Sequence, residues 1–146
     1  MFIRTACLAI VLAVSATVVI AQSNPIAQRK ELMKGMGEQA RLGNQMMRGQ
    51  APFDLAKAQA IFATFTSVPG KMVTLFPEDS KTGGDTEASP KIWEDMEGFK
   101  KRFASFETEA KAAQATLKDE DTFRVAFGNV SRNCGACHEN FRIKKQ

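Results

Sequence analysis

The chain has 146 residues, a length that predicts one folded domain. It carries 20 Lys and Arg against 16 Asp and Glu, which gives a formal net charge of +4. Because this charge is mild and both signs are mixed along the chain, it argues against a nucleic-acid-binding surface.

Residues 1–21 have the features of a secretory signal peptide. Arg4 supplies the positive charge, residues 6–20 form an apolar run, and residues 19–21 (Val-Ile-Ala) end in a small residue suited to cleavage. The run is shorter than the roughly 20 apolar residues that span a membrane. We therefore expect export from the cytoplasm, with residues 22–146 as the one domain and no membrane insertion after cleavage.

The first two helices are predicted from caps and breaks. Asn24-Pro25 is a good N-cap followed by a proline suited to the first helical position, and this helix should end near Arg48. A second helix should begin near Asp54 and be interrupted or kinked at Pro69-Gly70. Residues 77–90 show no apolar periodicity and are predicted to form a polar loop.

An unbroken heptad pattern predicts a third helix. Its apolar residues follow alternating spacings of four and three: Ile92, Met96, Phe99, Phe103, Phe106, Ala110, Ala113 and Leu117. Such a seam is typical of packing against nearly parallel or antiparallel helices. We expect Met96, as part of it, to lie in the core.

A fourth helix should follow a tight link at residues 118–121, which supplies its own N-capping acid. Its apolar face carries Phe123, Phe127, Val130, Cys134, Cys137 and Phe141. No segment shows convincing strand alternation. The predicted fold is therefore all-α, an antiparallel up-down four-helix bundle.

The fourth helix contains Cys134-Gly135-Ala136-Cys137-His138, the attachment pattern of haem c. In such sites both thiols bond to the porphyrin, and the adjacent histidine becomes the proximal axial ligand of the iron. The spacing of three residues places Cys134 and Cys137 on one side of a helix. We expect one covalent haem c near the C-terminal end of the bundle.

Two other chemistries use these residue types. A thioredoxin-like redox pair normally opens a helix within a βαβ unit, and no strand pattern precedes this motif. A zinc site needs four ligands. His138 is the only histidine, and the third cysteine, Cys7, lies in the predicted signal peptide. Residues 22–146 therefore offer no further thiol or imidazole to complete a zinc site.

The second axial position of the iron must be open, bound to water or filled by another side chain. The upstream methionines are Met33, Met36, Met46, Met47, Met72 and Met96. In an up-down bundle the start of the first helix lies beside the end of the fourth, which favours Met33 or Met36. Small residues, Gly37 and Ala40, share a face with Met33 and would let a flat ring approach, and Arg29 on that face could pair with a haem propionate. From the residues alone, Met33 as an iron ligand and Met33 as a core residue are both open.

The chain from the first helix to the C-terminal motif resembles the class II c-type cytochromes, the cytochrome c′ and cytochrome c-556 family. Four segments match in the family's order: RKELMK from Arg29, GQAPFD from Gly49, PKIWE from Pro90 and CGACHENFR from Cys134. The resemblance implies a four-helix bundle that exchanges electrons with other redox proteins and, together with the signal peptide, a periplasmic location in a Gram-negative bacterium.

The residue type at position 33 implies the subtype within that family. Cytochromes c′ usually have an apolar non-ligand there, often Leu, and a five-coordinate, high-spin iron that binds NO and CO. The c-556 branch has Met in a Leu-Met-Lys context, as in Leu32-Met33-Lys34, and a six-coordinate, low-spin iron. Gly70 replaces a Trp that several cytochromes c′ carry after the proline, which also fits c-556. Arg142 matches a basic residue near the proximal histidine of cytochromes c′; its other interpretation is a solvated charge.

The resemblance thus implies a low-spin cytochrome c-556 in which His138 and Met33 bind the iron, with a cytochrome c′ that binds NO or CO as the alternative. We do not expect an enzyme, since a haem peroxidase normally uses a distal histidine for acid–base catalysis. A helical interaction protein without haem would leave the motif unexplained. Monomer and homodimer are both open.

Overall fold

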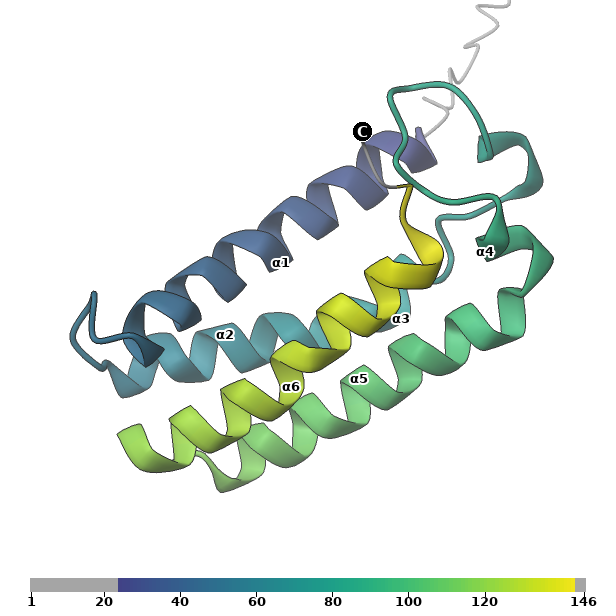
Figure 1. The fold of residues 1–146 in the computed structure, drawn as a ribbon. Coiled ribbons are helices and arrows are strands. Elements are labelled where there is room, and N and C mark those ends of the chain that lie inside the picture. The colour runs from purple at the N-terminus through teal and green to yellow at the C-terminus, as the bar shows by residue number, and fades with distance from the viewer. Residues whose placement is uncertain (1–23, 144–146) are drawn as a thin grey trace, which may run out of the picture.

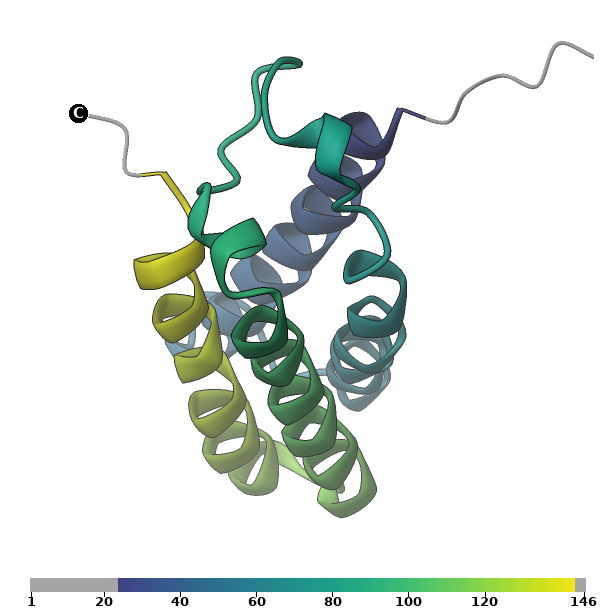
Figure 2. The same cartoon turned by 90° about the vertical axis from the view of Figure 1, so that its right-hand side faces the viewer.

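A computed structural model describes residues 24–143, and the predicted signal peptide lies outside the described residues. The described chain is an antiparallel, all-α bundle in which α1, α2, α5 and α6 are the long helices (Figures 1 and 2). The elements are α1 (Pro25–Met47), α2 (Leu55–Ser67), α3 (Pro69–Met72), η1 (Glu78–Ser80), α4 (Lys91–Glu94), α5 (Met96–Thr116) and α6 (Glu120–Phe141). The predicted fold class is confirmed.

Side-chain N-caps begin three of the long helices, and those of α1 and α6 were predicted. Asn24 accepts hydrogen bonds from two backbone N–H groups in the first turn of α1. Asp54 accepts one from Lys57 N, at the start of α2. Asp119 and Thr122 bond reciprocally in a capping box at the start of α6. Each such cap typically contributes about 1 kcal/mol to helix stability.

The third predicted helix is divided in two, so its prediction as one continuous helix was wrong. Asp95 leaves the helical conformation, with φ −131° and ψ 61°, between α4 and α5. Its carboxylate accepts a hydrogen bond from Gly98 N at 2.9 Å and so caps the new helix. The apolar spacing continues across this break because Ile92 is still buried, whereas Met96, expected in the core, is only half-buried.

Phenylalanine side chains from α2, α5 and α6 fill the core of the bundle. Phe62, Phe65, Phe123 and Phe127 are fully buried. The rings of Phe65 and Phe106 lie 5.5 Å apart between centroids, which joins α2 to α5. Burying one such side chain is worth roughly 1.5–3 kcal/mol, so this cluster is the main apolar stabilisation of the fold.

Helices α1 and α6 approach each other closely at Gly43. A Cβ atom at that position would overlap the ring of Phe127. Ten residues away on each helix, at Met33 and Cys137, the same two helices instead line a cavity. Gly43 therefore marks where direct packing of the two helices takes place.

The predicted polar loop lies within a longer connection, residues 73–90, which we call the α3–α4 loop. Its last part pairs with the end of α6: Ala88 and Arg142 form an isolated antiparallel bridge. Ser89 N donates to Phe141 O at 3.0 Å, and Ile143 N donates to Glu87 O at 2.8 Å. The loop thus attaches to α6 immediately after the Cys-x-x-Cys-His motif.

In the described part of the chain, no helix combines the length and the apolar character that crossing a bilayer would require.

Candidate haem site

A cavity of about 520 Å³ lies between α1, α5, α6 and the α3–α4 loop. Its size falls within the range of roughly 300–1,000 Å³ that is usual for ligand sites. Much of its wall is apolar, formed by Ala40, Phe65, Met72, Phe76, Ile92, Phe99, Phe103, Phe106 and Phe141. Such a wall excludes water from a hydrophobic cofactor.

The last turns of α6 bring the motif to this cavity. Cys134, Cys137 and His138 all line it, and the two cysteines form no disulfide with each other. The helical spacing predicted that the two thiols face one side, and the structure places them so. In the described chain, no cluster of three or more His, Cys, Asp or Glu residues could hold a metal ion.

Burial sets the protonation of the motif. It raises the pKa of the Cys134 thiol, and it raises the pKa of the Cys137 thiol against the opposing charge of Arg102. Before haem is attached, both thiols are therefore protonated at neutral pH. Burial, followed by the positive charge of Arg142, lowers the pKa of His138. Its imidazole is neutral at neutral pH, which is the form that binds a metal.

Three of the six methionines considered as axial ligands reach the cavity: Met33, Met36 and Met72. Met36 and Met72 are buried in the hydrophobic core, whereas Met33 is only half-buried. Gly37 and Ala40 line the cavity on the same helix as Met33. Two thiols, an imidazole, an adjacent thioether and a wall with small residues together fit a haem group.

Arg29 borders the cavity but is held by the α3–α4 loop. Its Nη1 donates to Ser80 Oγ at 2.9 Å and to Leu75 O at 3.1 Å. Its Nη2 donates to Ser80 O and to Thr86 Oγ1, each at 2.8 Å. Burial lowers the pKa of Arg29, but a guanidinium remains charged at neutral pH. The propionate contact of Arg29 stays a prediction, and the loop contacts are a role that the sequence did not indicate.

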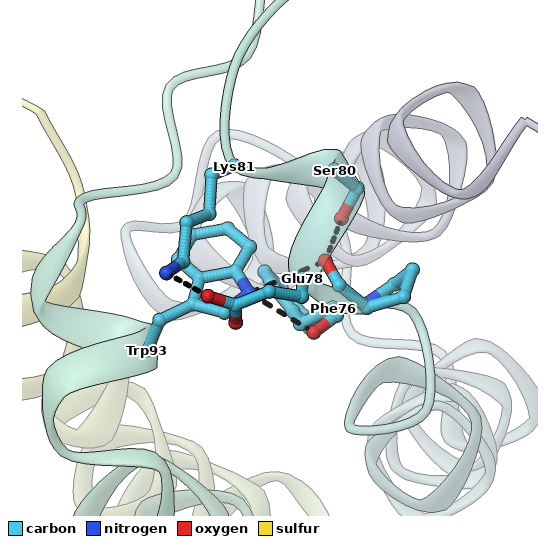
Figure 3. Close-up of polar contacts among 6 residues, drawn as sticks. Phe76, Glu78, Ser80, Lys81 and Trp93 are labelled. Carbon is cyan, nitrogen blue, oxygen red and sulfur yellow. Dashed lines mark hydrogen bonds and ion pairs between the residues drawn. The ribbon is translucent and has the colours of Figure 1, made fainter.

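The part of the loop that contacts Arg29 is itself fixed by polar contacts (Figure 3). Trp93 Nε1 donates to Phe76 O at 3.1 Å, and Ser80 Oγ donates to Pro77 O at 2.8 Å. The Arg29 guanidinium lies 4.7 Å from the centroid of the Phe76 ring. These contacts hold the Phe76 ring in the cavity wall.

Glu87 and Arg142 form a second polar contact at the cavity. Arg142 Nε donates to Glu87 Oε2 at 2.7 Å, and both residues line the cavity together with His138. The importance of Glu87 was not predictable from the sequence, because this residue lies in a polar loop without periodicity. The one sequence feature that pointed toward this contact was the position of its partner, Arg142, four residues after His138.

A family model described as Cytochrome C′ matches residues 24–142. The chain belongs to the cytochrome c′ family. The expected class II resemblance is therefore confirmed, and with it the cofactor: members of this family carry covalent haem c, and the position of Cys134 and Cys137 in the cavity wall is consistent with its attachment.

Relatives of both subtypes match the chain. A cytochrome c′ of Rhodopseudomonas palustris is 43% identical over 99% of each chain. A cytochrome c-556 of the same organism is 31% identical over 98% of this chain and 99% of its own. A solved structure of R. palustris cytochrome c′ has a TM-score of 0.82 at 46% identity, covering 86% of this chain and all of that one. The greater similarity to cytochrome c′ favours the alternative over the c-556 subtype that Met33 implied.

Proposed function

We propose that this chain is a periplasmic electron carrier with one haem c attached to Cys134 and Cys137 and with His138 as the proximal ligand. The observation that carries the proposal is that both thiols and the imidazole line one largely apolar cavity. The haem supplies a one-electron change of its iron. The chain binds the group, orients it through α6 and keeps water from its faces, while other redox proteins exchange the electron. We propose a carrier and not an enzyme, because the sequence has no second histidine for acid–base catalysis.

For the second axial position, the support is stronger for a cytochrome c′ type. This chain shares more identity with the cytochrome c′ than with the cytochrome c-556 of a single organism, 43% against 31%, which supports the cytochrome c′ subtype. In this proposal Met33 forms part of the wall, and the iron is open to NO or CO.

One specific observation favours a second candidate, the low-spin c-556 type. Met33 is the half-buried methionine of the cavity wall, whereas Met36 and Met72 are committed to the core. It also stands on α1, across the cavity from the helix that carries His138. Here Met33 binds the iron and must dissociate before a gas can bind.

Optical spectra of the purified holoprotein, oxidised and reduced, decide between the two types. A high-spin spectrum that changes readily with CO, and is unaltered by Met33→Ala, supports the cytochrome c′ type. Low-spin bands with a weak far-red sulfur-to-iron band, converted to a high-spin spectrum by Met33→Ala, overturn it in favour of c-556. Met36→Ala is the matched control on the same helix. A purified protein without covalent haem would contradict both.

A further inference from the structure

The ion pair between Glu87 and Arg142 joins the α3–α4 loop to the residue that follows α6. Arg142 Nε donates to Glu87 Oε2 at 2.7 Å, and Nη2 contacts the same oxygen. The Glu87 side chain is 31% exposed and that of Arg142 is 51% exposed. The pair is thus partly shielded from solvent and retains more interaction energy than a fully exposed pair.

The pair lies beside His138. Arg142 N donates to His138 O at 3.3 Å, at the end of α6, and both charged residues line the cavity with the imidazole. Their charges act on His138 in opposite directions: Arg142 lowers its pKa and Glu87 raises it. Both charges are therefore close enough to affect this ligand electrostatically.

The backbone holds Glu87 in place independently of its carboxylate. The hydrogen bond from Ile143 N to Glu87 O, and that from Ser89 N to Phe141 O, lie on either side of the bridge at Ala88. A change of the Glu87 side chain to an uncharged amide keeps these backbone groups. The charge of Glu87 can therefore be removed while the loop stays attached to α6.

We propose that Glu87 is a positioning residue that holds the Arg142 guanidinium beside His138, balances its charge there and thereby sets the reduction potential of the haem. This rests on the proposed function for the covalent haem and for His138 as its iron ligand. A positive charge near the iron disfavours its oxidised state, and a negative charge favours it. Glu87 alone would lower the potential and Arg142 alone would raise it; as a pair they largely cancel.

The test is the reduction potential of the holoprotein, measured by spectroelectrochemistry at low ionic strength, where screening is weakest. We expect Glu87→Gln to raise the potential, Arg142→Gln to lower it, and the double variant to return near the wild-type value. Glu120→Gln is the matched control. It also removes a carboxylate from an ion pair with an arginine, Arg124, but its partner lies 14 residues, about 21 Å along the helix, from His138. We expect it to leave the potential nearly unchanged.

Amide hydrogen exchange at Ser89 and Ile143 separates charge from structure. Retained protection in Glu87→Gln, with a raised potential, supports the proposal. Shifts in the same direction for Glu87→Gln and Arg142→Gln, a shift no larger than that of Glu120→Gln, or lost amide protection would each overturn it. If Arg142→Gln does not fold, the comparison of Glu87→Gln with Glu120→Gln still decides whether the charge of Glu87 affects the reduction potential. A wild-type protein without covalent haem has no haem potential to measure, which marks failure of the proposed function instead.

Discussion

Arg29 is a buried cation whose charge is compensated by oxygen dipoles of the α3–α4 loop. Four hydrogen bonds link its guanidinium to Leu75, Ser80 and Thr86, and its side chain also stacks on Phe76. In the described chain no buried side-chain nitrogen or oxygen lacks a hydrogen-bond partner. Arg29 therefore fastens the loop to α1 and helps to keep the cavity wall closed.

Replacing Arg29 should destabilise the protein. We expect Arg29→Met to lower the free energy of unfolding by about 3 kcal/mol, because it leaves several oxygens of the loop without their donor. Arg41→Met, at an exposed site on the same helix, should change it by no more than about 0.5 kcal/mol. Urea unfolding of the two holoprotein variants measures the difference. Equal effects would show that Arg29 does not fasten the loop.

At the residue scale, the sequence predicted the members of the site better than their contacts. Cys134, Cys137 and Met33 reach one cavity because helical spacing and antiparallel packing follow from local patterns. The partners of Arg29 and the position of Glu87 were not predictable. They depend on the path of a loop whose residues have no periodicity, and that path is fixed only by tertiary contacts.

At the element scale, helix ends were predictable where a single residue marks them. The N-caps at Asn24, Asp54 and Asp119 are such residues. The break at Asp95 was missed because an apolar pattern records which side is buried, not whether the backbone is continuous. Asp95 is of a residue type that is preferred at N-caps, and Gly98, three residues further on, leaves room for its carboxylate. This pair could have indicated a helix start at Asp95.

Gly43 is required by the close packing of α1 on α6. We expect Gly43→Ala to lower the free energy of unfolding by about 1–3 kcal/mol, because the new methyl group overlaps the buried ring of Phe127. Gly35→Ala has open space around it and should stabilise α1 by up to about 1 kcal/mol. Thermal unfolding of the two variants should shift in opposite directions. A stabilising effect of both would contradict the close approach.

Asp119 makes the start of α6 sensitive to acid. Hydrogen bonds from the Thr122 backbone and side chain lower the pKa of Asp119 below its usual value. Its contribution to stability is therefore complete above about pH 4 and is lost as the pH falls through the lowered pKa. Asp119→Asn keeps a capping oxygen that does not titrate, so its melting temperature should fall less than that of the wild type below about pH 4. Identical acid dependence would contradict the assignment.

At the scale of the whole molecule, the bundle has a phenylalanine core and, beside it, a cavity that needs an occupant. The apolar cavity wall includes Met33 from α1 and Phe141 from α6, and these faces would be open to water without haem. The bundle was predictable from patterning, and the location of the cavity from antiparallel order. The volume of the cavity and the polar residues at its border were not predictable, since they arise from the packing of the α3–α4 loop.

A protein without haem should therefore be weakest at the cavity end. We expect Cys134→Ser with Cys137→Ser to lower the free energy of unfolding by several kcal/mol, because the bound group stabilises only the folded state. Hydrogen exchange should quicken first in α1 near Met33 and in α6 near His138, while amides near Phe62 in α2 stay protected. Uniform loss of protection would contradict this division of the bundle.

The central claim is that Cys134, Cys137 and His138 hold one haem c in the cavity beside α1. The most direct measurement is the intact mass of the purified, exported protein, taken under denaturing conditions together with its visible spectrum. We expect a mass increased by one haem in the wild type and the loss of this increase in Cys134→Ser with Cys137→Ser. An unmodified mass from cells that make other c-type cytochromes normally would contradict it.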